Sequence, residues 1–309
     1  MNALDILRLL PGTLRDRAIR RLVAIKPREI EDVTVKVAST AAEIEAAARV
    51  LHDAYVARGL LPAHASGVRV TPHLILPTTA TFIAKRGDEV VGTMALILDG
   101  PLGLPMDKIY GEEIAALRAQ GRKLAEVGAL CVAKGHRRQG ISFLLNKIML
   151  HCARELLGVD DLVIAVHPDA EVLYRAALLF HRIGPTRSYP GLNKTALATA
   201  LRLDVRAAPA LYLRTFGKAK RLSNPYHMYV VDETAQLEMP AASNFLEKVR
   251  LPRMHAAAAL ARARPDAFAD LGAQECEQLR RLLPNVLLPQ PLAPQEAVSE
   301  RRSSGITYR

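Results

Sequence analysis

The chain has 309 residues, half of them apolar, with a formal net charge of +11 and no tryptophan. This length allows one large domain, or one domain with helical additions at its ends, around an aliphatic core. The excess of basic residues indicates an acidic partner, which would be nucleic acid, an anionic membrane surface or an acidic protein. No apolar run reaches the roughly 18 residues that a spanning helix needs, which excludes a transmembrane helix.

The cysteines and the N-terminus bear on the cellular compartment. Cys131, Cys152 and Cys276 are widely spaced, odd in number and without a CxxC pattern, so we expect buried free thiols in a reducing environment. The sequence offers no His/Cys cluster for a metal ion. Residues 1–17 carry charges inside their apolar stretch and have no small-residue cleavage site, so we predict a cytoplasmic protein.

Residues 1–30 are predicted to form an amphipathic helical segment of two short pieces separated by Pro11. In the second piece, apolar side chains at positions 14, 18, 22 and 25 share one face, and basic side chains line the rest. One interpretation is a helix packed on the main domain. The other is a basic helix lying on a membrane surface, which would make the protein membrane-associated.

From residue 33 the sequence alternates between strands and helices in the order β-α-β-β-β-α-β-α-β. The predicted strands are residues 33–37, the two arms of a hairpin within 80–98, 123–132, 161–167 and 195–205. The predicted helices are residues 39–59, about 139–157 and 169–184, the last stopping at Gly184 with Pro185 beyond it. Residues 99–121 form a long excursion between two strands, which begins as a loop and ends as a short helix.

After residue 240 the pattern becomes helical again, within residues 246–264 and 274–288. The last residues, 289–309, are rich in proline, serine and charge, and we expect them to be disordered. We therefore divide the chain into the N-terminal segment (1–30), a central domain (31–239), a C-terminal helical extension (240–288) and the tail (289–309). The central domain is predicted to be an α/β (α+β) domain with a mixed sheet.

The most informative stretch is 124–150, where a strand leads through a basic loop into a long helix. The loop carries Lys134, His136, Arg137 and Arg138, and the helix begins with Gln139, Gly140, Ile141 and Ser142. A helix N-terminus presents unpaired N–H groups and the positive end of its dipole, which suits a phosphate group. Gly140 removes the side chain where a ligand would approach the backbone, and Ser142 adds a hydroxyl group. We predict a phosphate-binding turn here.

Two residues of the preceding strand are unusual for a sheet interior. Gly128 indicates a bulge, a close backbone approach or simply tight packing. Period-two alternation places Glu126 on the same face as Leu124 and Leu130, where its neighbours are apolar. Glu126 is therefore either an outward-facing surface residue or a general base whose pKa is raised by partial desolvation.

Two residues follow the next predicted strand. Tyr174 lies on the following helix and is either a general acid for a departing thiolate or an aromatic side chain of the core. His167 ends the strand, just before Pro168. We interpret it as a structural, hydrogen-bonded histidine, with a substrate contact as the alternative.

The RRxG sequence at the strand–loop–helix junction resembles the pyrophosphate-binding turn of the GNAT acetyltransferase superfamily, Q/R-x-x-G-x-G/A. Arg137, Gly140 and Ser142 fall at the pattern positions, with Ser142 in place of the second small residue. The resemblance implies the GNAT fold, a mixed central sheet splayed between two parallel strands, here with added N- and C-terminal helices. It also implies that the pantetheine arm pairs with the first splayed strand, at Gly128 and Ala129.

A longer pattern, over roughly residues 78–205, resembles the FeeM-like N-acyl amino acid synthases, a GNAT branch related in fold to acyl-homoserine-lactone synthases. The pattern consists of PLGLPMD (101–107), E-x-x-x-LR (113–118), LAEV-x-x-L (124–130), His167-Pro168, Tyr174 and R-x-YP (187–190). The resemblance implies transfer of a long-chain acyl group to the amino group of an amino acid. The donor would be acyl-phosphopantetheine on acyl carrier protein or acyl-CoA, with no permanently bound cofactor.

Within that resemblance we expect Glu126 and Tyr174 to be the catalytic base and acid. Residues 139–142, with Arg137 and Arg138, would hold the phosphate, and the basic loop would face the acidic carrier protein. Residues 99–121 would wall an acyl pocket or form an ordinary capping insert.

Three alternatives stay open: a CoA-dependent transferase acting on another small amine, a homoserine-lactone synthase, and a non-catalytic basic binding protein. The second is disfavoured because Ala129 replaces the arginine of that family's E-x-x-R pair. Within the third, nucleic acid is disfavoured because the Lys and Arg residues are dispersed and no aromatic stacking platform interleaves them.

Overall fold

A computed structural model of the chain describes residues 30–189, 192–193, 196–219 and 224–287, together with Leu14 and Ala18. The predictions for the N-terminal segment fall outside the described residues, apart from these two positions and Ile30. Those for the tail, and for Pro190 of the R-x-YP pattern, also fall outside them.

A seven-stranded mixed sheet forms the centre of the molecule, with the strand order β1-β2-β3-β4-β5-β7-β6. The strands are β1 (Val33–Val37), β2 (Thr79–Arg86), β3 (Glu89–Leu98), β4 (Leu124–Val132), β5 (Asp161–Val166), β6 (His181–Ser188) and β7 (Leu197–Asp204). Neighbouring strands are antiparallel except β4 and β5, which are parallel. The pairing of β4 with β5 ends at Glu126 and Val163, so the two strands separate beyond this point. This separation confirms the predicted splay.

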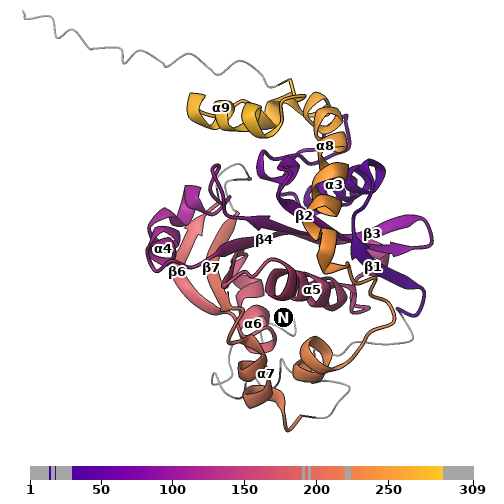
Figure 1. The fold of residues 1–309 in the computed structure, drawn as a ribbon, viewed down its shortest axis with the longest axis vertical. Coiled ribbons are helices and arrows are strands. Elements are labelled where there is room, and N and C mark those ends of the chain that lie inside the picture. Colours follow the sequence, from indigo (N-terminus) through magenta and orange to yellow (C-terminus); the bar gives the residue numbers. More distant parts are fainter. Residues whose placement is uncertain are drawn as a thin grey trace, which may run out of the picture.

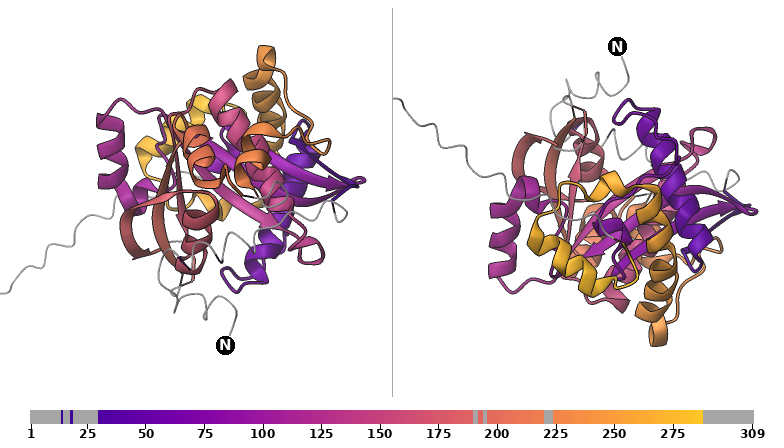
Figure 2. Two further views of the ribbon diagram at one scale, coloured as in Figure 1. Left: turned by 90° about the horizontal axis from the view of Figure 1, so that it is seen from below. Right: turned by 90° about the horizontal axis from the view of Figure 1, so that it is seen from above.

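Helices cover both faces of the sheet, as Figures 1 and 2 show. One face carries α3 (Ala41–Val56), α8 (Phe245–Ala263) and α9 (Ala273–Leu282). The other carries α5 (Ile141–His151), α6 (Pro168–Ala177) and α7 (Ala208–Phe216), while α4 (Asp107–Ala119) packs at the β6 end. Shorter helical turns span His73–Ile75, Lys134–His136, Cys152–Leu156, His227–Val231, Ala242–Asn244 and Pro265–Phe268.

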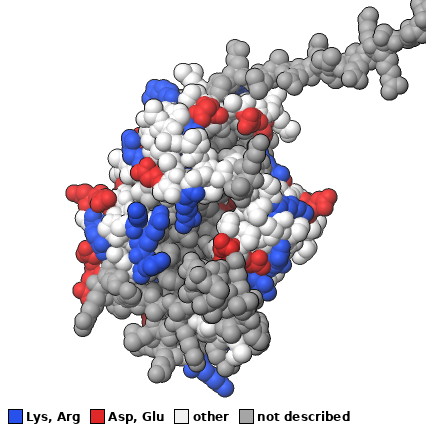
Figure 3. All heavy atoms as spheres, turned by 180° about the vertical axis from the view of Figure 1, so that it is seen from behind, with Lys and Arg blue, Asp and Glu red and all other residues white. Residues whose placement is uncertain are grey.

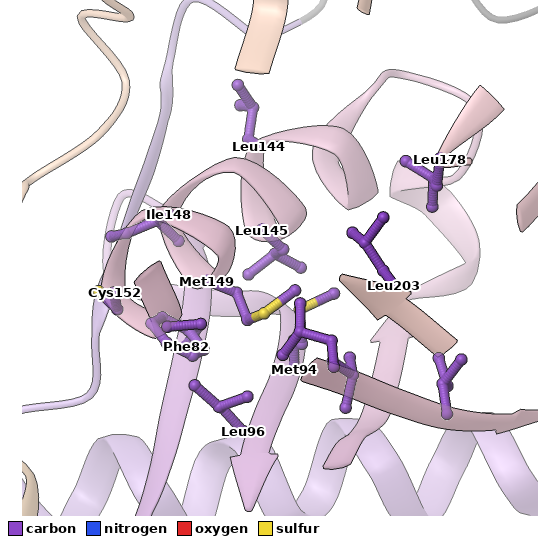
Figure 4. Packing of buried hydrophobic residues seen from close by; sticks show 14 of the residues in the cluster. Phe82, Met94, Leu96, Leu144, Leu145, Ile148, Met149, Cys152, Leu178 and Leu203 are labelled. Atoms are coloured by element: carbon purple, nitrogen blue, oxygen red, sulfur yellow. The ribbon is translucent and has the colours of Figure 1, made fainter. Parts of the chain in front are cut away.

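The main core lies between the sheet and α5 and is aliphatic, as the composition predicts. Figure 4 shows Leu145 and Met149 of α5 pointing toward Phe82, Met94 and Leu96 on the strands. Removing such side chains from water supplies most of the free energy that holds a helix on a sheet. The three cysteines are buried and free, as predicted.

The observed elements depart from the predicted ones in two places. The predicted helix 169–184 ends at Ala177, and residues 181–188 form β6 instead, paired with β7. Leu179 has a left-handed backbone (φ +57°), which ends the helical path, and the partner strand of β6 comes from later in the chain. The helix predicted to begin near Gln139 begins at Ile141, and it becomes a π-helical turn after His151. We made no prediction for α7.

The C-terminal extension folds back onto the central domain. Just before the extension, residues 236–238 lie along β1, with hydrogen bonds joining Val35 to Gln236 and Glu238 at 2.7 and 2.9 Å. Beyond them α8 packs on α3, and α9 completes the same apolar cluster. None of the helices in the described part of the chain is both long and apolar enough to cross a membrane.

Candidate active site

Glu126 lies on β4 at the last position paired with β5. Its side chain is only 4% exposed, and Oε2 accepts a hydrogen bond from the backbone N–H of Met106 at 2.8 Å. Burial raises the pKa of Glu126 to about 8, with a smaller contribution from the Asp107 carboxylate, while the Met106 bond opposes the rise. The outward-facing interpretation is therefore wrong. A carboxyl group that loses its proton near pH 8 suits the chemistry of a general base.

A bulge lies in β4 three residues after Glu126. The register with β3 shifts between Thr93 and Ala95, and Ala129 opposite them has a left-handed backbone with φ +53°. The extra residue reverses the alternation, so Leu130 packs in the main core on the face opposite Glu126. The prediction that Glu126 and Leu130 share a face is wrong for this reason.

Gly128 precedes the bulge and does not itself need to be glycine for backbone conformation. A Cβ added there would meet only Ile97 Cδ1, at the ordinary contact distance of 3.8 Å. Residues 128–130 are half-exposed, and this part of β4 pairs with β3 alone because β5 has separated. The backbone of Gly128 and Ala129 is therefore accessible along an unpaired strand edge, where an extended ligand arm can pair with it.

The predicted phosphate-binding turn is a helix N-terminus. Gly140 is the N-cap of α5 with φ +99°, a conformation that residues with a side chain rarely adopt. The first intrahelical bond is donated by Phe143, and the N–H groups of Ile141 and Ser142 donate to none of the described residues. The Ile141 side chain is buried in the core, so only its backbone faces this site.

The side chains around this turn have different surroundings. Arg137 and Arg138 are exposed, and Arg137 Nε donates to the Val132 carbonyl at 3.0 Å. Gln139 accepts from Arg86 at 3.4 Å, and the same arginine lies 2.8 Å from His136 Nδ1. Two arginines are therefore accessible to an anion at the α5 N-terminus, while Gln139 is partly engaged in holding the loop.

Tyr174 lies on α6, which follows β5. It is 8% exposed and packs edge-on to Phe180, with 5.7 Å between the ring centroids. Burial raises the pKa of Tyr174 to about 12, so the hydroxyl group keeps its proton at neutral pH. The hydroxyl donates to none of the residues that the structure describes. His167 is the N-cap of the same helix and accepts from the Asp169 N–H at 3.2 Å, which confirms its structural interpretation.

A pocket that is open to solvent lies on the sheet face that carries Glu126. It is bounded by α3, β2, β3, β4 and α8, and its lining includes Ala129, Arg69 and Arg253. No residue of 99–121 lines it, so this excursion does not wall this pocket. The excursion instead packs over the end of the sheet and supplies the Met106 amide that holds Glu126.

Comparison with known proteins identifies the family. The model of the FeeM N-acyl amino acid synthase family matches residues 46–204. The chain belongs to this family. The solved structure of FeeM, an N-acyl amino acid synthase from uncultured soil microbes, is 30% identical and covers 59% of this chain and 96% of that chain, with a TM-score of 0.52. The FeeM-family chain is therefore an N-acyltransferase with the GNAT fold, as the sequence predicts.

More distant matches include acyl-homoserine lactone synthases. LasI is 14% identical, covering 60% of this chain and 95% of that chain with a TM-score of 0.45. The CoA-dependent enzyme MesI is 15% identical, covering 66% of this chain and 98% of that chain with the same TM-score of 0.45. No curated protein matches this chain.

The structure adds two residues that no sequence pattern indicates, Arg69 and Tyr55, and brings Tyr189 of the R-x-YP pattern close to both. Arg69 lies over the Tyr55 ring, with its guanidinium carbon 4.5 Å from the centroid. Burial raises the pKa of Tyr55 and of Tyr189, and the Glu126 carboxylate acts on both in the same direction. Burial also lowers the pKa of Arg69. Arg69 and Tyr55 leave no sequence signal because they come from the loop after α3 and from α3 itself, which only folding brings together with Tyr189.

Among the described residues, no group of three His, Cys, Asp or Glu side chains could hold a metal ion. The face of the molecule in Figure 3 shows Lys and Arg side chains interspersed with Asp and Glu, without one continuous basic surface.

Proposed function

We propose that this FeeM-family enzyme transfers a long-chain acyl group from the phosphopantetheine thioester of acyl carrier protein to the amino group of an amino acid. The product is an N-acyl amino acid. The observation that carries this proposal is the buried Glu126 carboxyl group at the point where β4 and β5 separate. A thioester placed along the unpaired edge of β4 would lie beside it.

Donor binding would use the backbone of two elements. The N–H groups at 139–142, contributed by Gln139, Gly140, Ile141 and Ser142, would bind the phosphate, assisted by Arg137 and Arg138. The pantetheine arm would take the place of β5 along Gly128 and Ala129. A backbone N–H there would polarise the thioester carbonyl and stabilise the oxyanion that develops on it.

The chemical step requires a neutral amine, since an ammonium group has no lone pair. Glu126 would remove a proton from the ammonium group, directly or through a water molecule. The amine then attacks the thioester carbon, and the resulting tetrahedral intermediate collapses by breaking its C–S bond. Tyr174 would donate a proton to the departing thiolate. The attacking nitrogen would lose a proton as the amide forms, and this proton would restore Tyr174.

The choice of carrier protein as donor rests on charge. Lys134, Arg137 and Arg138 are exposed at the turn where the phosphate would bind, and an acidic carrier protein would dock there. Acyl-CoA would use the same turn with a pyrophosphate. Contact of residues 1–30 with a membrane surface stays a prediction from the sequence.

The experiment that tests the function is mass spectrometry of lipid extracts from cells that express the chain. We expect N-acyl amino acids with the unaltered chain and with Glu112→Gln, a control at an exposed carboxylate of α4. Loss of a general base lowers turnover by about 10²- to 10⁴-fold, so Glu126→Gln should abolish the product while donor binding persists. Identical extracts from all three would contradict the proposal.

Purified enzyme then separates the two donors. Acyl carrier protein should give the higher kcat/KM, and its advantage over acyl-CoA should fall as salt is raised, because exposed charges are screened. Equal kcat/KM values for both donors at all salt concentrations would contradict the preference for acyl carrier protein, and acyl-CoA would then be an equally good donor.

A further inference from the structure

The pocket beside Glu126 has an unusual composition for an acyl-chain pocket. Of its fourteen lining residues, ten are apolar, two are threonine, two are arginine and none is acidic. Ala129 belongs to the lining, so the pocket reaches the β4 bulge where the thioester is proposed to lie. Two guanidinium groups in an apolar pocket favour a ligand that carries both a negative charge and an apolar part.

Arg253 is the more deeply placed of the two, with only 3% of its surface exposed. It enters from α8 and donates to the carbonyls of Leu74 and Thr79 and to the Thr81 hydroxyl group. Its Nε has no hydrogen-bond partner among the described residues, and no carboxylate of theirs pairs with the guanidinium group. A buried charge without a counter-charge is costly, and an anionic ligand would offset that cost.

Arg69 lines the same pocket and is partly exposed. It forms no ion pair with any residue in the described ranges, and its guanidinium group packs over the Tyr55 ring. Tyr55 is near enough to both Arg69 and Glu126 for each charge to shift the pKa of its hydroxyl group. The Tyr55 ring therefore lies near both the Arg69 guanidinium group and the candidate base.

We propose that this pocket is the acceptor site, in which Arg69 binds the carboxylate of the amino acid and the buried charge of Arg253 lies behind it. The apolar lining would hold an apolar side chain, and the amino group would face Glu126. This inference rests on the proposed function and names the class of its acceptor. An acyl chain in the same pocket would leave both guanidinium groups without a counter-charge, which favours the acceptor.

The inference gives the C-terminal extension a part in acceptor selection. Arg253 and Leu260 both line the pocket from α8. This helix lies beyond residues 46–204, the part that matches the family. Acceptor selectivity in this enzyme would then depend on α8 residues that lie outside the region matched by the family model.

The test compares an apolar amino acid with its carboxamide as acceptors for the purified full-length enzyme. A group built to pair with a charge discriminates strongly against a neutral analogue, so we expect at least about a tenfold preference for the carboxylate. Arg69→Gln should raise KM for the amino acid about 10- to 100-fold, leave the donor KM unchanged and abolish the preference. Arg69→Lys keeps the positive charge and should retain part of the preference for the carboxylate.

Two further variants control this result. Arg49 is an exposed arginine of α3 that donates to the Ser66 carbonyl, in the loop that also carries Arg69. It does not line the pocket, so Arg49→Gln should behave like the unaltered enzyme. Arg253→Lys keeps a positive charge and should weaken the preference less than Arg69→Gln. An unchanged preference in Arg69→Gln, or a change in acyl-length selection instead, would overturn the inference.

A binding measurement keeps this inference separate from the proposed function. Calorimetry with an N-acyl amino acid and with its carboxamide reports the carboxylate contact without turnover. If the enzyme acylates no amino acid, the proposed function fails, and the relative affinities of these two ligands still decide the inference. Equal affinities in the unaltered enzyme would refute it.

Discussion

Glu126 has a backbone that is paired on both sides and a carboxyl group that is buried. Its backbone is fixed by pairing with both β3 and β5, so the side chain is held at the last position before the strands separate. The carboxyl group is nearly removed from water and has one described hydrogen bond, from Met106. Burial disfavours the charged form and thereby makes the group a stronger base once it is ionised.

The pH dependence follows from this environment. Because the base acts only when deprotonated, the rate should rise about tenfold per pH unit below the pKa of Glu126 and level off near pH 8. A pH–rate profile at saturating acceptor measures this rise, and Glu126→Gln should remove it. A profile that is flat between pH 6 and 8 would exclude Glu126 as the base.

The same pKa shift has a consequence for stability. The folded pKa of Glu126 is about 8 against an ordinary 4.5, so the folded chain holds a proton that the unfolded chain releases between these values. Its contribution to stability is therefore fully present below pH 4.5 and is lost as the pH rises toward 8. The Glu126→Gln protein should consequently gain stability relative to the unaltered chain over this range.

At the scale of the element, β4 is a strand with two halves. Residues 124–126 pair on both sides, whereas the rest pairs with β3 alone and carries the Ala129 bulge. The bulge reverses which side chains face each side of the sheet. Leu130 therefore packs against the core, while Gly128 and Ala129 stay half-exposed. A single strand thus holds the candidate base rigidly and still presents accessible backbone to a ligand.

Two substitutions in β4 should separate folding from ligand binding. At φ +53°, Ala129→Gly should stabilise the fold by about 1 kcal/mol, because a Cβ is unfavourable in this conformation. Gly128→Ala has room for its methyl group and should change the free energy of unfolding by less than about 0.5 kcal/mol. It should nevertheless raise the donor KM, because the methyl group would stand where the pantetheine arm approaches.

Urea denaturation and donor kinetics, run on both variants, check these expectations. A Gly128→Ala enzyme with an unaltered donor KM would show that tight ligand approach at this residue is not required.

At the scale of the whole molecule, the C-terminal extension is part of the domain's core. Ala256, Ala257 and Leu260 of α8 are buried against α3 and the sheet, and Arg253 binds backbone carbonyls more than 170 residues earlier in the sequence. Residues 236–238, which lead into the extension, also bond to Val35 of β1. The extension and the central domain should therefore unfold together.

Two leucines of α8 test this coupling. Leu260 is 4% exposed, and Leu260→Ala should cost about 2–5 kcal/mol of unfolding free energy. Leu251, on the same helix, is 55% exposed, and Leu251→Ala should change stability by at most about 0.5 kcal/mol. Both values come from chemical denaturation of the full chain. Equal costs, or a second unfolding transition confined to Leu260→Ala, would indicate that the extension is an independent unit.

The sequence by itself determined the elements whose signals are local. The hairpin of β2 and β3, the strand–loop–helix of β4 and α5 and the helices α8 and α9 follow from side-chain periodicity and turn residues within each segment. Gly140 could be found from sequence because a left-handed helix N-cap favours glycine. The family pattern in the same region gave the GNAT fold and the acyltransferase class.

Only the tertiary structure decided the rest. Residues 181–188 became β6 because β7, from later in the chain, supplies their hydrogen bonds. The exposure of Glu126 depended on the Met106 segment that covers it, and the face of Leu130 depended on the register with β3. Arg69 and Arg253 are more than 180 positions apart and have no shared pattern, yet the packing of α8 on α3 brings both into one pocket. Such long-range contacts leave no local trace, because burial and pairing depend on which distant segment covers a residue.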